Sequence, residues 1–362
     1  MKYIDEFRNL KLARKISAGI KTLMPQEDIR IMEVCGTHTQ SFFRFGLSGL
    51  LPARLKLISG PGCPVCVSPQ EYIDRAISIA GVKDTLVLTF GDMLRVPGTR
   101  SSLENERWKS GNPRVVYSPW ESLNTAQRNP DKRVVFLAVG FETTAPAIAL
   151  TILAAQKQKL KNLSFFCALK AIPPAMQFLL ADKRLKINAF LCPGHVSAII
   201  GTRPYEFIAR RYKVGCCVAG FEPLDILEGI YFLLLQIKSK RAKVVNQYAR
   251  LVRPEGNPKA KAAISAVFQK CPAVWRGLGE IPQSGLKIKK TFSRFDTEKV
   301  FALKPIAQGA AKKSRCLCGD VLKGLVTPRD CPLFGKACNP GHPFGPCMVT
   351  HEGACNAYFK YS

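Results

Sequence analysis

Residues 59–71 read Ser59-Gly60-Pro61-Gly62-Cys63-Pro64-Val65-Cys66-Val67-Ser68-Pro69-Gln70-Glu71 and place two thiols, two residues apart, on a turn stiffened by glycine and proline. The turn follows an apolar strand predicted over residues 55–58 and precedes a predicted helix, with Ser68 as its N-cap, Pro69 at its first position and Glu71 completing a capping box. A C-x-x-C pair just before a helix N-terminus lies where the pKa of a thiol falls and its sulfur is accessible. The stretch therefore predicts a bound metal or a reversible disulfide, in preference to two thiols that only pack in a core.

The composition is that of an ordinary globular protein, with 47% hydrophobic and 22% charged residues in a chain of 362, which is enough for two or three domains. Residues 1–7 lack the apolar core of a signal peptide, so we expect a cytoplasmic protein. The most apolar long stretch, residues 134–155, contains Glu142 and Pro146 and predicts a strand and a buried helix rather than a membrane span. In a reducing cytosol, 14 cysteines indicate metal or redox chemistry rather than a framework of structural disulfides.

The formal charge of +28 is unusually high and suits nucleic acid or an acidic partner. The basic runs, however, fall at predicted helix ends and linkers and lack the interleaved aromatic residues of a base-stacking surface. A solvated surface or an acidic protein partner is therefore the better interpretation, and nucleic-acid binding is unlikely.

Apolar strands alternate with amphipathic helices along most of the chain. The strands are predicted at residues 29–34, 55–59, 85–90, 133–139, 163–168, 188–192 and 214–219. Alternation at this spacing is typical of βαβ units and predicts an α/β fold with mainly parallel sheets. We expect three contiguous units: an N-terminal α/β domain over 1–125, a second over 126–240, and a linker with a cysteine-rich domain over 241–362.

Polar residues follow the carboxyl ends of several predicted strands, where ligands bind in open α/β sheets. Cys35 and His38 stand three residues apart after the first strand, and Asp92 and Glu142 follow two later strands. The fold would bring these ends to one edge, although Asp92 and Glu142 also fit as helix N-caps or first-turn acids. No Gly-rich dinucleotide or P-loop motif follows any strand, which argues against a conventional nucleotide site.

The last segment is distinct because it holds six cysteines within forty residues and is rich in glycine and proline: Cys316, Cys318, Cys331, Cys338, Cys347 and Cys355. A [4Fe–4S] cluster on four of these thiolates, a zinc ion, or disulfides would each staple so small a segment. The spacing fits a zinc ribbon poorly, since Cys316 and Cys318 are too close, and Cys331-Pro332 resembles the Cys-Pro of cluster ligands. The spacing alone does not choose which four bind.

The N-terminal thiols Cys35, Cys63 and Cys66 form a separate set of soft ligands, with His38 near, that suits iron, zinc or copper(I). Three ligands leave coordination positions open, which is the condition for handling a bound ligand.

The chain resembles the hydrogenase-maturation family HypD over nearly its whole length. The resemblance is carried by long and chemically unusual strings, which are Met32-Glu33-Val34-Cys35-Gly36-Thr37-His38-Thr39, Ser59-Gly60-Pro61-Gly62-Cys63-Pro64-Val65-Cys66, Thr89-Phe90-Gly91-Asp92-Met93-Leu94-Arg95-Val96-Pro97-Gly98, Gly140-Phe141-Glu142-Thr143-Thr144-Ala145-Pro146, Pro193-Gly194-His195-Val196-Ser197 and the tail ending Glu352-Gly353-Ala354-Cys355-Asn356-Ala357-Tyr358. Cys167, Cys192, Cys216, Cys217 and Cys271 lie outside these assignments.

The resemblance implies two Rossmann-like parallel-sheet α/β domains and a small C-terminal domain that holds a [4Fe–4S] cluster. It implies a redox-active scaffold, rather than a conventional turnover enzyme, on which the Fe(CN)₂CO unit of [NiFe] hydrogenase is assembled with a HypC-type chaperone and a HypE-type cyanide-delivering protein. By the same resemblance, Cys35, Cys63 and Cys66 bind iron, while His38, Asp92 and Glu352 line that site. We assign Cys316, Cys331, Cys338 and Cys355 to the cluster and Cys318 and Cys347 to a redox-active pair.

Two other classes of protein compete with this interpretation. One is a cluster-dependent thiol-disulfide oxidoreductase in which Cys63 and Cys66 reduce a protein substrate. The other is a zinc-braced nucleic-acid-binding protein, for which the only argument is the charge of +28.

Overall fold

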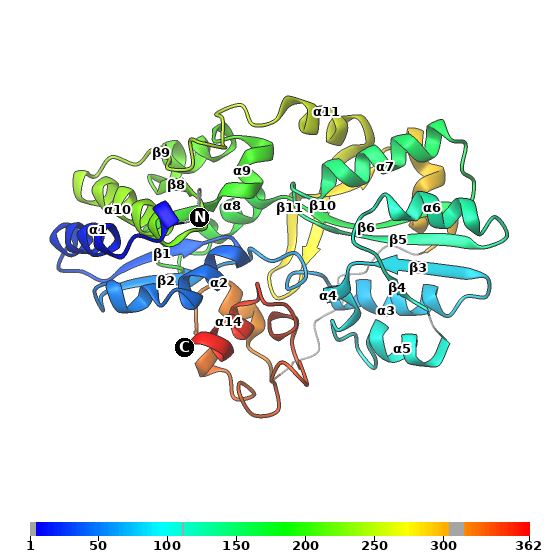
Figure 1. Ribbon diagram of the computed structural model, residues 1–362, viewed down its shortest axis with the longest axis horizontal. Helices are drawn as coiled ribbons and strands as arrows, with labels where there is room; N and C mark the ends of the chain where they lie inside the picture. The colour runs from blue at the N-terminus through cyan, green and yellow to red at the C-terminus, as the bar shows by residue number, and fades with distance from the viewer. Residues whose placement is uncertain (1–4, 111, 304–314) are drawn as a thin grey trace.

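Two β-sheets lie side by side, and a cysteine-rich tail packs beneath the first of them (Figure 1). The computed structural model describes residues 5–110, 112–303 and 315–362. Each predicted strand is present within one or two residues of its expected position, so the expected α/β fold with parallel sheets is confirmed.

The first sheet is parallel throughout, with the strand order β2-β1-β7-β8-β9. Its strands are β1 (Ile29–Glu33), β2 (Leu55–Ser59), β7 (Ala189–Pro193), β8 (Gly215–Ala219) and β9 (Val244–Asn246). Both faces are apolar, as a parallel sheet covered on two sides requires. One face packs on α1 (Leu10–Leu23) and α10 (Pro223–Ser239), and the other on α8 (Ile172–Ala181) and α9 (Gly194–Ile200).

The second sheet has the strand order β10-β11-β6-β5-β3-β4. Its parallel strands are β3 (Thr85–Thr89), β4 (Arg114–Val115), β5 (Arg133–Gly140) and β6 (Leu163–Lys170). An antiparallel hairpin of β10 (Phe268–Trp275) and β11 (Gly279–Ile288) extends it beyond β6. The covering helices are α3 (Gln70–Ala80) and α5 (Leu103–Ser110) on one face and α6 (Glu121–Arg128), α7 (Ala145–Lys157) and α11 (Pro258–Val267) on the other.

The chain passes back and forth between the two sheets. Residues 29–59 and 189–246 supply the first sheet, while 85–170 and 268–288 supply the second. This grouping differs from the contiguous units 1–125, 126–240 and 241–362 expected from the sequence. The physical reason is that β7 pairs with β1 rather than with β6, and the local βα pattern carries no information on that choice.

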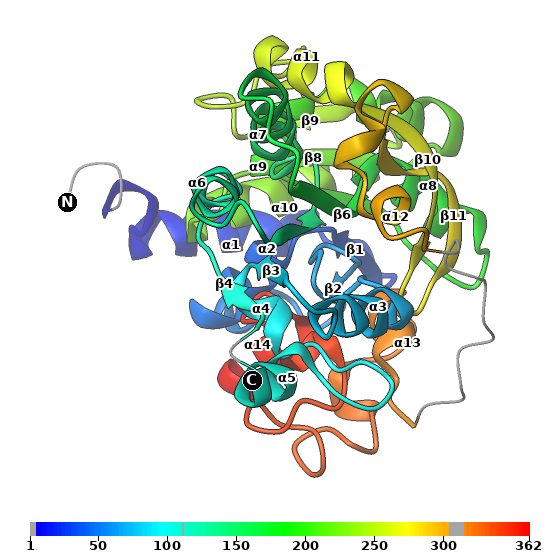
Figure 2. The ribbon, with the colours of Figure 1, turned by 90° about the vertical axis from the view of Figure 1, so that its right-hand side faces the viewer.

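The tail shares its core with the first sheet. Five of its cysteines pack in one apolar cluster with Met32, Cys63 and Cys66. Its helices are α13 (Cys318–Leu322) and α14 (Ala354–Tyr361), and α14 lies against α2 (Gly36–Arg44), with the rings of Tyr358 and Phe43 4.4 Å apart. Figure 2 shows the tail below the strands.

Two local expectations are wrong. Ser68 does not cap α3, because its hydroxyl donates to the carbonyl of Pro64 and the N-cap position is taken by Pro69. Residues 268–288, expected to be part of a connecting region, form the β10–β11 hairpin.

In the part of the chain that the structure describes, no helix combines the length and the apolar character needed to cross a membrane.

Candidate thiol and metal site

Cys35 lies where β1 gives way to α2 and touches the turn that carries Cys63 and Cys66. The amide of Gly36 donates to the carbonyl of Gly62 at 3.1 Å, and that of Gly60 donates to Glu33 at 2.7 Å. A side chain at Gly62 would collide with the backbone of Cys35, so glycine is required for this approach. Two loops about thirty residues apart in sequence are therefore fixed against each other.

Glu352 reaches these thiols from the tail. Its Oε1 accepts a hydrogen bond from the Thr37 hydroxyl at 2.7 Å. Its charge is among the causes that raise the pKa of both Cys35 and Cys63, after burial as the largest cause, and Cys66 in turn raises the pKa of Glu352. One carboxylate therefore lies within electrostatic range of all three sulfurs.

The imidazole beside Cys35 belongs to His195 and not to His38. The ring nitrogens of His195 lie 3.8 and 4.0 Å from Cys35 Sγ, and the ring stacks on Phe221. His38 is fully buried and its Nε2 contacts the carbonyl of Gly220 at 2.8 Å. Burial lowers the pKa of each imidazole to about 4, so both rings are neutral at physiological pH.

His38 still contributes to the site, through its backbone. Its amide stabilises the thiolate form of Cys35, although burial dominates and raises the pKa of that thiol. Sequence reasoning missed His195 as the neighbour of Cys35, although the string 193–197 had been noted after a strand.

Asp92 stands on the exposed first turn of α4 (Gly91–Leu94). Its charge partly opposes the lowering of the pKa of Cys66 and adds to the raised pKa of Glu352, so Asp92 lies within electrostatic range of both groups. Glu142 lies elsewhere: it is buried and accepts the amide of Ile172 at 2.9 Å, at the start of α8. The sequence left Asp92 and Glu142 open as either site residues or helix-capping acids. Of these two, Asp92 is the one near the thiols.

A second buried acid, Glu33, supports the loop of Cys35. Its carboxyl group accepts hydrogen bonds from the backbone N–H of Cys35, at 2.9 Å, and from the hydroxyl of Thr39. Burial raises the pKa of Glu33 to about 8, so the group holds a proton at neutral pH. A charged residue inside the apolar run of β1 was the sequence signal for this residue, and it was not used.

The turn that carries Cys63 and Cys66 contacts the cysteines of the tail. Burial disfavours a thiolate at Cys66, but hydrogen bonds from Cys347 and Cys63 outweigh it and lower the pKa of Cys66. Cys347 Sγ lies 2.6 Å from Cys318 Sγ. The sulfur atoms of Cys66, Cys347 and Cys318 therefore follow one another in contact from the N-terminal turn into the tail.

All six tail cysteines line one small cavity, together with Phe334, Gly345 and Met348. Burial raises the pKa of Cys316 and of Cys338, the charges of Cys331 and Cys355 add to this in both cases, and that of Cys318 adds to it for Cys316. Cys318 and Cys347 make the 2.6 Å contact, and Cys347 also hydrogen-bonds to Cys355 and Cys66. Among the residues described, no three His, Cys, Asp or Glu side chains are already placed to hold a single metal ion. The donor set is nevertheless one that suits a cysteine-ligated cluster.

Fold and site together define an α/β protein in which buried thiols of one sheet meet a cysteine-rich tail, an arrangement consistent with metal binding. A sequence model of the HypD family, described as "Hydrogenase formation hypA family", matches residues 11–362, and the chain belongs to this family.

Named relatives agree with this assignment over the full length of the chain. The chain is 46% identical over 369 residues to the hydrogenase expression/formation protein HupD of Azotobacter chroococcum mcd 1, covering 100% of this chain and 97% of the relative. It is 45% identical to the hydrogenase maturation factor HypD of Azotobacter vinelandii, with the same coverage. It is 42% identical over 370 residues to HypD of Escherichia coli K12, covering 100% of this chain and 98% of the relative.

Proposed function

We propose that this chain is a cytoplasmic maturation factor for [NiFe] hydrogenase, on which the Fe(CN)₂CO unit is assembled. The observation that carries the proposal is the packing of the turn around Cys63 and Cys66 against Cys35, with Glu352 within range of all three sulfurs. Family membership supplies the link to hydrogenase.

The ligand set fits this cargo. Cyanide and carbon monoxide are strong-field ligands that favour low-spin ferrous iron, and thiolates are soft, electron-rich donors suited to it. Burial keeps the Cys35 and Cys63 thiols protonated, so iron binding must release their protons. Neutral His195, 3.8 Å from Cys35 Sγ, is placed to accept one of them.

We assign Cys316, Cys331, Cys338 and Cys355 as ligands of a [4Fe–4S] cluster in the tail. These residues line one cavity, and the amide of Phe344 donates to Cys338 Sγ at 3.3 Å, an interaction that stabilises ligated sulfur. When bound, such a cluster supplies single electrons.

In this proposal the two other tail cysteines, Cys318 and Cys347, keep the iron-binding thiols Cys63 and Cys66 reduced. If Cys63 and Cys66 form a disulfide, the Cys347 thiol, whose pKa is raised by its hydrogen bond to Cys318, first loses its proton and then attacks the sulfur of Cys66. This releases Cys63, which takes up a proton because burial raises its pKa. Cys318 then attacks Cys347, which frees Cys66 and leaves a Cys318–Cys347 disulfide. Two successive one-electron transfers from a reduced cluster, with two protons, would return this disulfide to two thiols. The contacts from Cys66 to Cys347 and from Cys347 to Cys318 support this order.

Burial argues against the alternative in which Cys63 and Cys66 reduce a protein substrate. Cys63 is 3% exposed and Cys66 is 0% exposed, so a disulfide on another protein does not reach them without movement of the tail. An ion or a diatomic ligand needs a much smaller opening.

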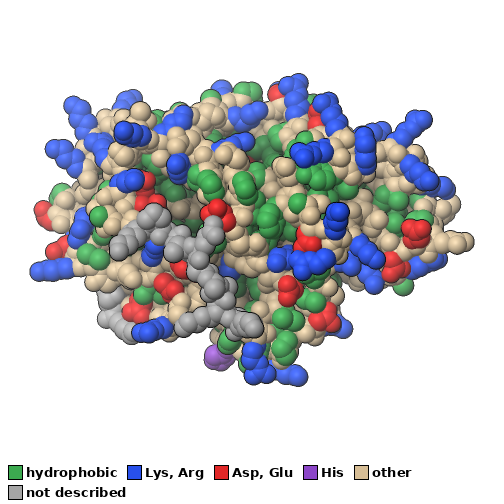
Figure 3. Space-filling view, turned by 180° about the vertical axis from the view of Figure 1, so that it is seen from behind, with side chains coloured by type: hydrophobic (Ala, Val, Ile, Leu, Met, Phe, Trp, Pro, Cys, Tyr) green, Lys and Arg blue, Asp and Glu red, His purple; other side chains and the backbone are tan. Residues whose placement is uncertain are grey.

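HypC-type and HypE-type proteins are the partners that we propose, from the family resemblance. Lys and Arg side chains are spread over the face seen in Figure 3 rather than gathered in one patch. This distribution favours long-range attraction of acidic proteins over a single nucleic-acid groove.

Complementation tests the proposal. In a hydrogenase-producing cell that lacks its own HypD, the wild-type chain should restore hydrogenase activity and Cys35→Ala should not. Cys217→Ala is the matched control, because it removes a buried thiol of β8 that packs with α1 and α10, whereas Cys63 and Cys66 pack in the cluster on the other face of the sheet. Restoration by Cys35→Ala, or failure of the wild-type chain, would contradict the proposal.

A further inference from the structure

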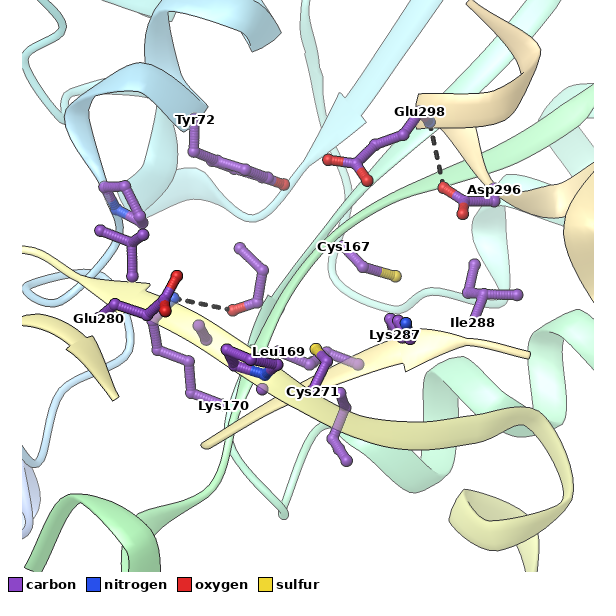
Figure 4. Close-up of a pocket in the computed structure, with 17 residues that line it drawn as sticks. Tyr72, Cys167, Leu169, Lys170, Cys271, Glu280, Lys287, Ile288, Asp296 and Glu298 are labelled. Atoms are coloured by element: carbon purple, nitrogen blue, oxygen red, sulfur yellow. Dashed lines mark hydrogen bonds between the residues drawn. The ribbon is translucent and has the colours of Figure 1, made fainter. Parts of the chain in front are cut away.

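A second cavity, of about 270 Å³, lies in the other half of the molecule (Figure 4). It opens where β11 leaves β6, because the two strands pair only at Gly285–Lys170 and Leu286–Leu169. The short helix α12 (Thr297–Val300) and the start of α3 complete its wall. Its volume is slightly below the roughly 300–1,000 Å³ of typical small-molecule sites.

Lys170 is the chemically unusual residue of this cavity. It is only 2% exposed, and its Nζ has two long contacts, the carbonyl of Ala168 at 3.5 Å and the ring of Trp275 at 5.9 Å. No carboxylate among the described residues pairs with it, and burial lowers the pKa of Lys170 to about 7. Buried lysines are almost never left without a partner, so the amine has unused capacity for an anion.

The opposite end of the cavity is acidic. Asp296 and Glu298 lie on the α12 side of β6, whereas Lys170 and Cys271 lie on the hairpin side (Figure 4). Burial raises the pKa of both acids, so each would gain from a hydrogen-bond donor or a cation. Asp296 also accepts a hydrogen bond from the amide of Glu298 at 3.1 Å. The charges of Arg75 and Lys299 act on the Glu298 carboxylate against the effect of burial, and burial prevails.

Apolar groups lie between the two ends. The walls there are formed by Leu169, Leu286, Ile288 and the buried ring of Tyr72. The titratable groups that line the cavity together with Lys170 are Tyr72 of α3, Cys167 of β6, Cys271 of β10, Glu280 and Lys287 of β11, and Asp296 and Glu298 at α12.

We propose that this cavity binds a small amino or hydroxy acid, with its carboxylate at Lys170 and its amino or hydroxyl group at Glu298. The apolar walls exclude water from a short carbon chain between the two ends. The inference rests on this cavity alone and does not depend on the proposed iron chemistry.

Isothermal titration of the full-length chain at pH 7 with 4-aminobutyrate, butyrate and inorganic phosphate tests the proposal. We expect 4-aminobutyrate to bind more tightly than butyrate, and phosphate not to bind. Lys170→Met should weaken both acids by about tenfold or more, because a buried charge-assisted hydrogen bond is lost. Glu298→Gln should weaken 4-aminobutyrate alone, and Lys132→Met, which removes an exposed lysine near β5, should change neither.

Three results would overturn the inference: equal binding by the Lys170→Met chain, binding of phosphate alone, or no binding of either acid at about 50 mM.

A measurement on the wild-type chain guards against misfolding of the variants. In a chain biosynthetically labelled with ¹³C-lysine, the side-chain NMR signal of Lys170 should titrate at higher pH when 4-aminobutyrate is present. An unchanged titration would also refute the proposal.

Discussion

Cys66 and Cys35 lie in the same buried region but differ in ionisation, because their neighbours differ. Cys66 receives hydrogen bonds from two other thiols, which outweigh burial and lower its pKa. Cys35 has no such thiol donor, so burial and the charge of Glu352 raise its pKa. Thiol-disulfide exchange is faster with a leaving group of low pKa, so the lower pKa of Cys66 favours the second step of the proposed relay, in which Cys318 attacks Cys347 and frees Cys66.

Removal of Cys318 tests the proposed order of thiol exchange. In Cys318→Ala, Cys347 loses the thiol that lies 2.6 Å away, so a mixed disulfide with Cys66 has no resolving partner. We expect air-exposed Cys318→Ala protein to retain oxidised Cys66 after reduction of the tail, whereas the wild-type chain recovers both thiols. Differential alkylation and mass spectrometry measure this, and full recovery in the variant would refute the relay.

Glu142 makes a prediction about the pH dependence of stability. Burial raises its pKa from 4.5 to about 7, so the folded chain keeps a proton that the unfolded chain releases. The stabilising contribution is complete below pH 4.5 and is lost as the pH rises to about 7, a total of about 3 kcal/mol.

Glu142→Gln should remove this pH dependence, because the glutamine side chain is neutral at every pH. Its oxygen can still accept the hydrogen bond from the backbone N–H of Ile172. Urea unfolding at pH 5 and pH 8 should show the variant gaining stability relative to wild type at the higher pH. An identical difference between the two proteins at both pH values would contradict the assigned proton.

The β10–β11 hairpin links the second sheet to the candidate site. At its tip the amide of Arg276 donates to the carbonyl of Val67 at 2.9 Å, one residue after Cys66. Gly277 packs on Gly319, one residue after Cys318. One element therefore touches the segments of both the N-terminal turn and the tail pair.

Exchange of Gly277 for alanine tests the contact of this hairpin with the tail. A Cβ at Gly277 would lie 2.5 Å from Gly319 Cα, and the residue has φ +80°. We expect Gly277→Ala to loosen the tail and to speed its cleavage in limited proteolysis. Gly279→Ala is the control, since Gly279 has φ +90° but nothing within 4 Å, so it shares the backbone strain without the collision. Equal cleavage of the two variants would show that the contact does not hold the tail.

The sequence predicted most elements of the parallel sheets because their buried strands are continuous apolar runs. It missed the hairpin because Pro272 and Pro282 interrupt both strands and exposed polar residues alternate irregularly along them. It identified the thiols and Glu352 through unusual strings, but it did not distinguish His195 from His38. That choice depends on how the two rings pack around Phe221.

At the scale of the whole molecule, the interleaved topology makes the site depend on both sheets. The thiols of the first sheet, Asp92 after β3 and the tail with Glu352 meet only when the chain has crossed between the sheets and returned. The shared core of the tail and the first sheet indicates that the tail folds against the sheet rather than independently.

Infrared spectroscopy of the anaerobically purified complex with a HypC-type partner tests the central claim most directly. The wild-type chain should show the stretching bands of iron-bound CO and CN, Cys35→Ala should lack them, and Cys217→Ala should keep them. Bands of undiminished intensity in Cys35→Ala, with the complex intact, would show that the iron is held somewhere other than this site.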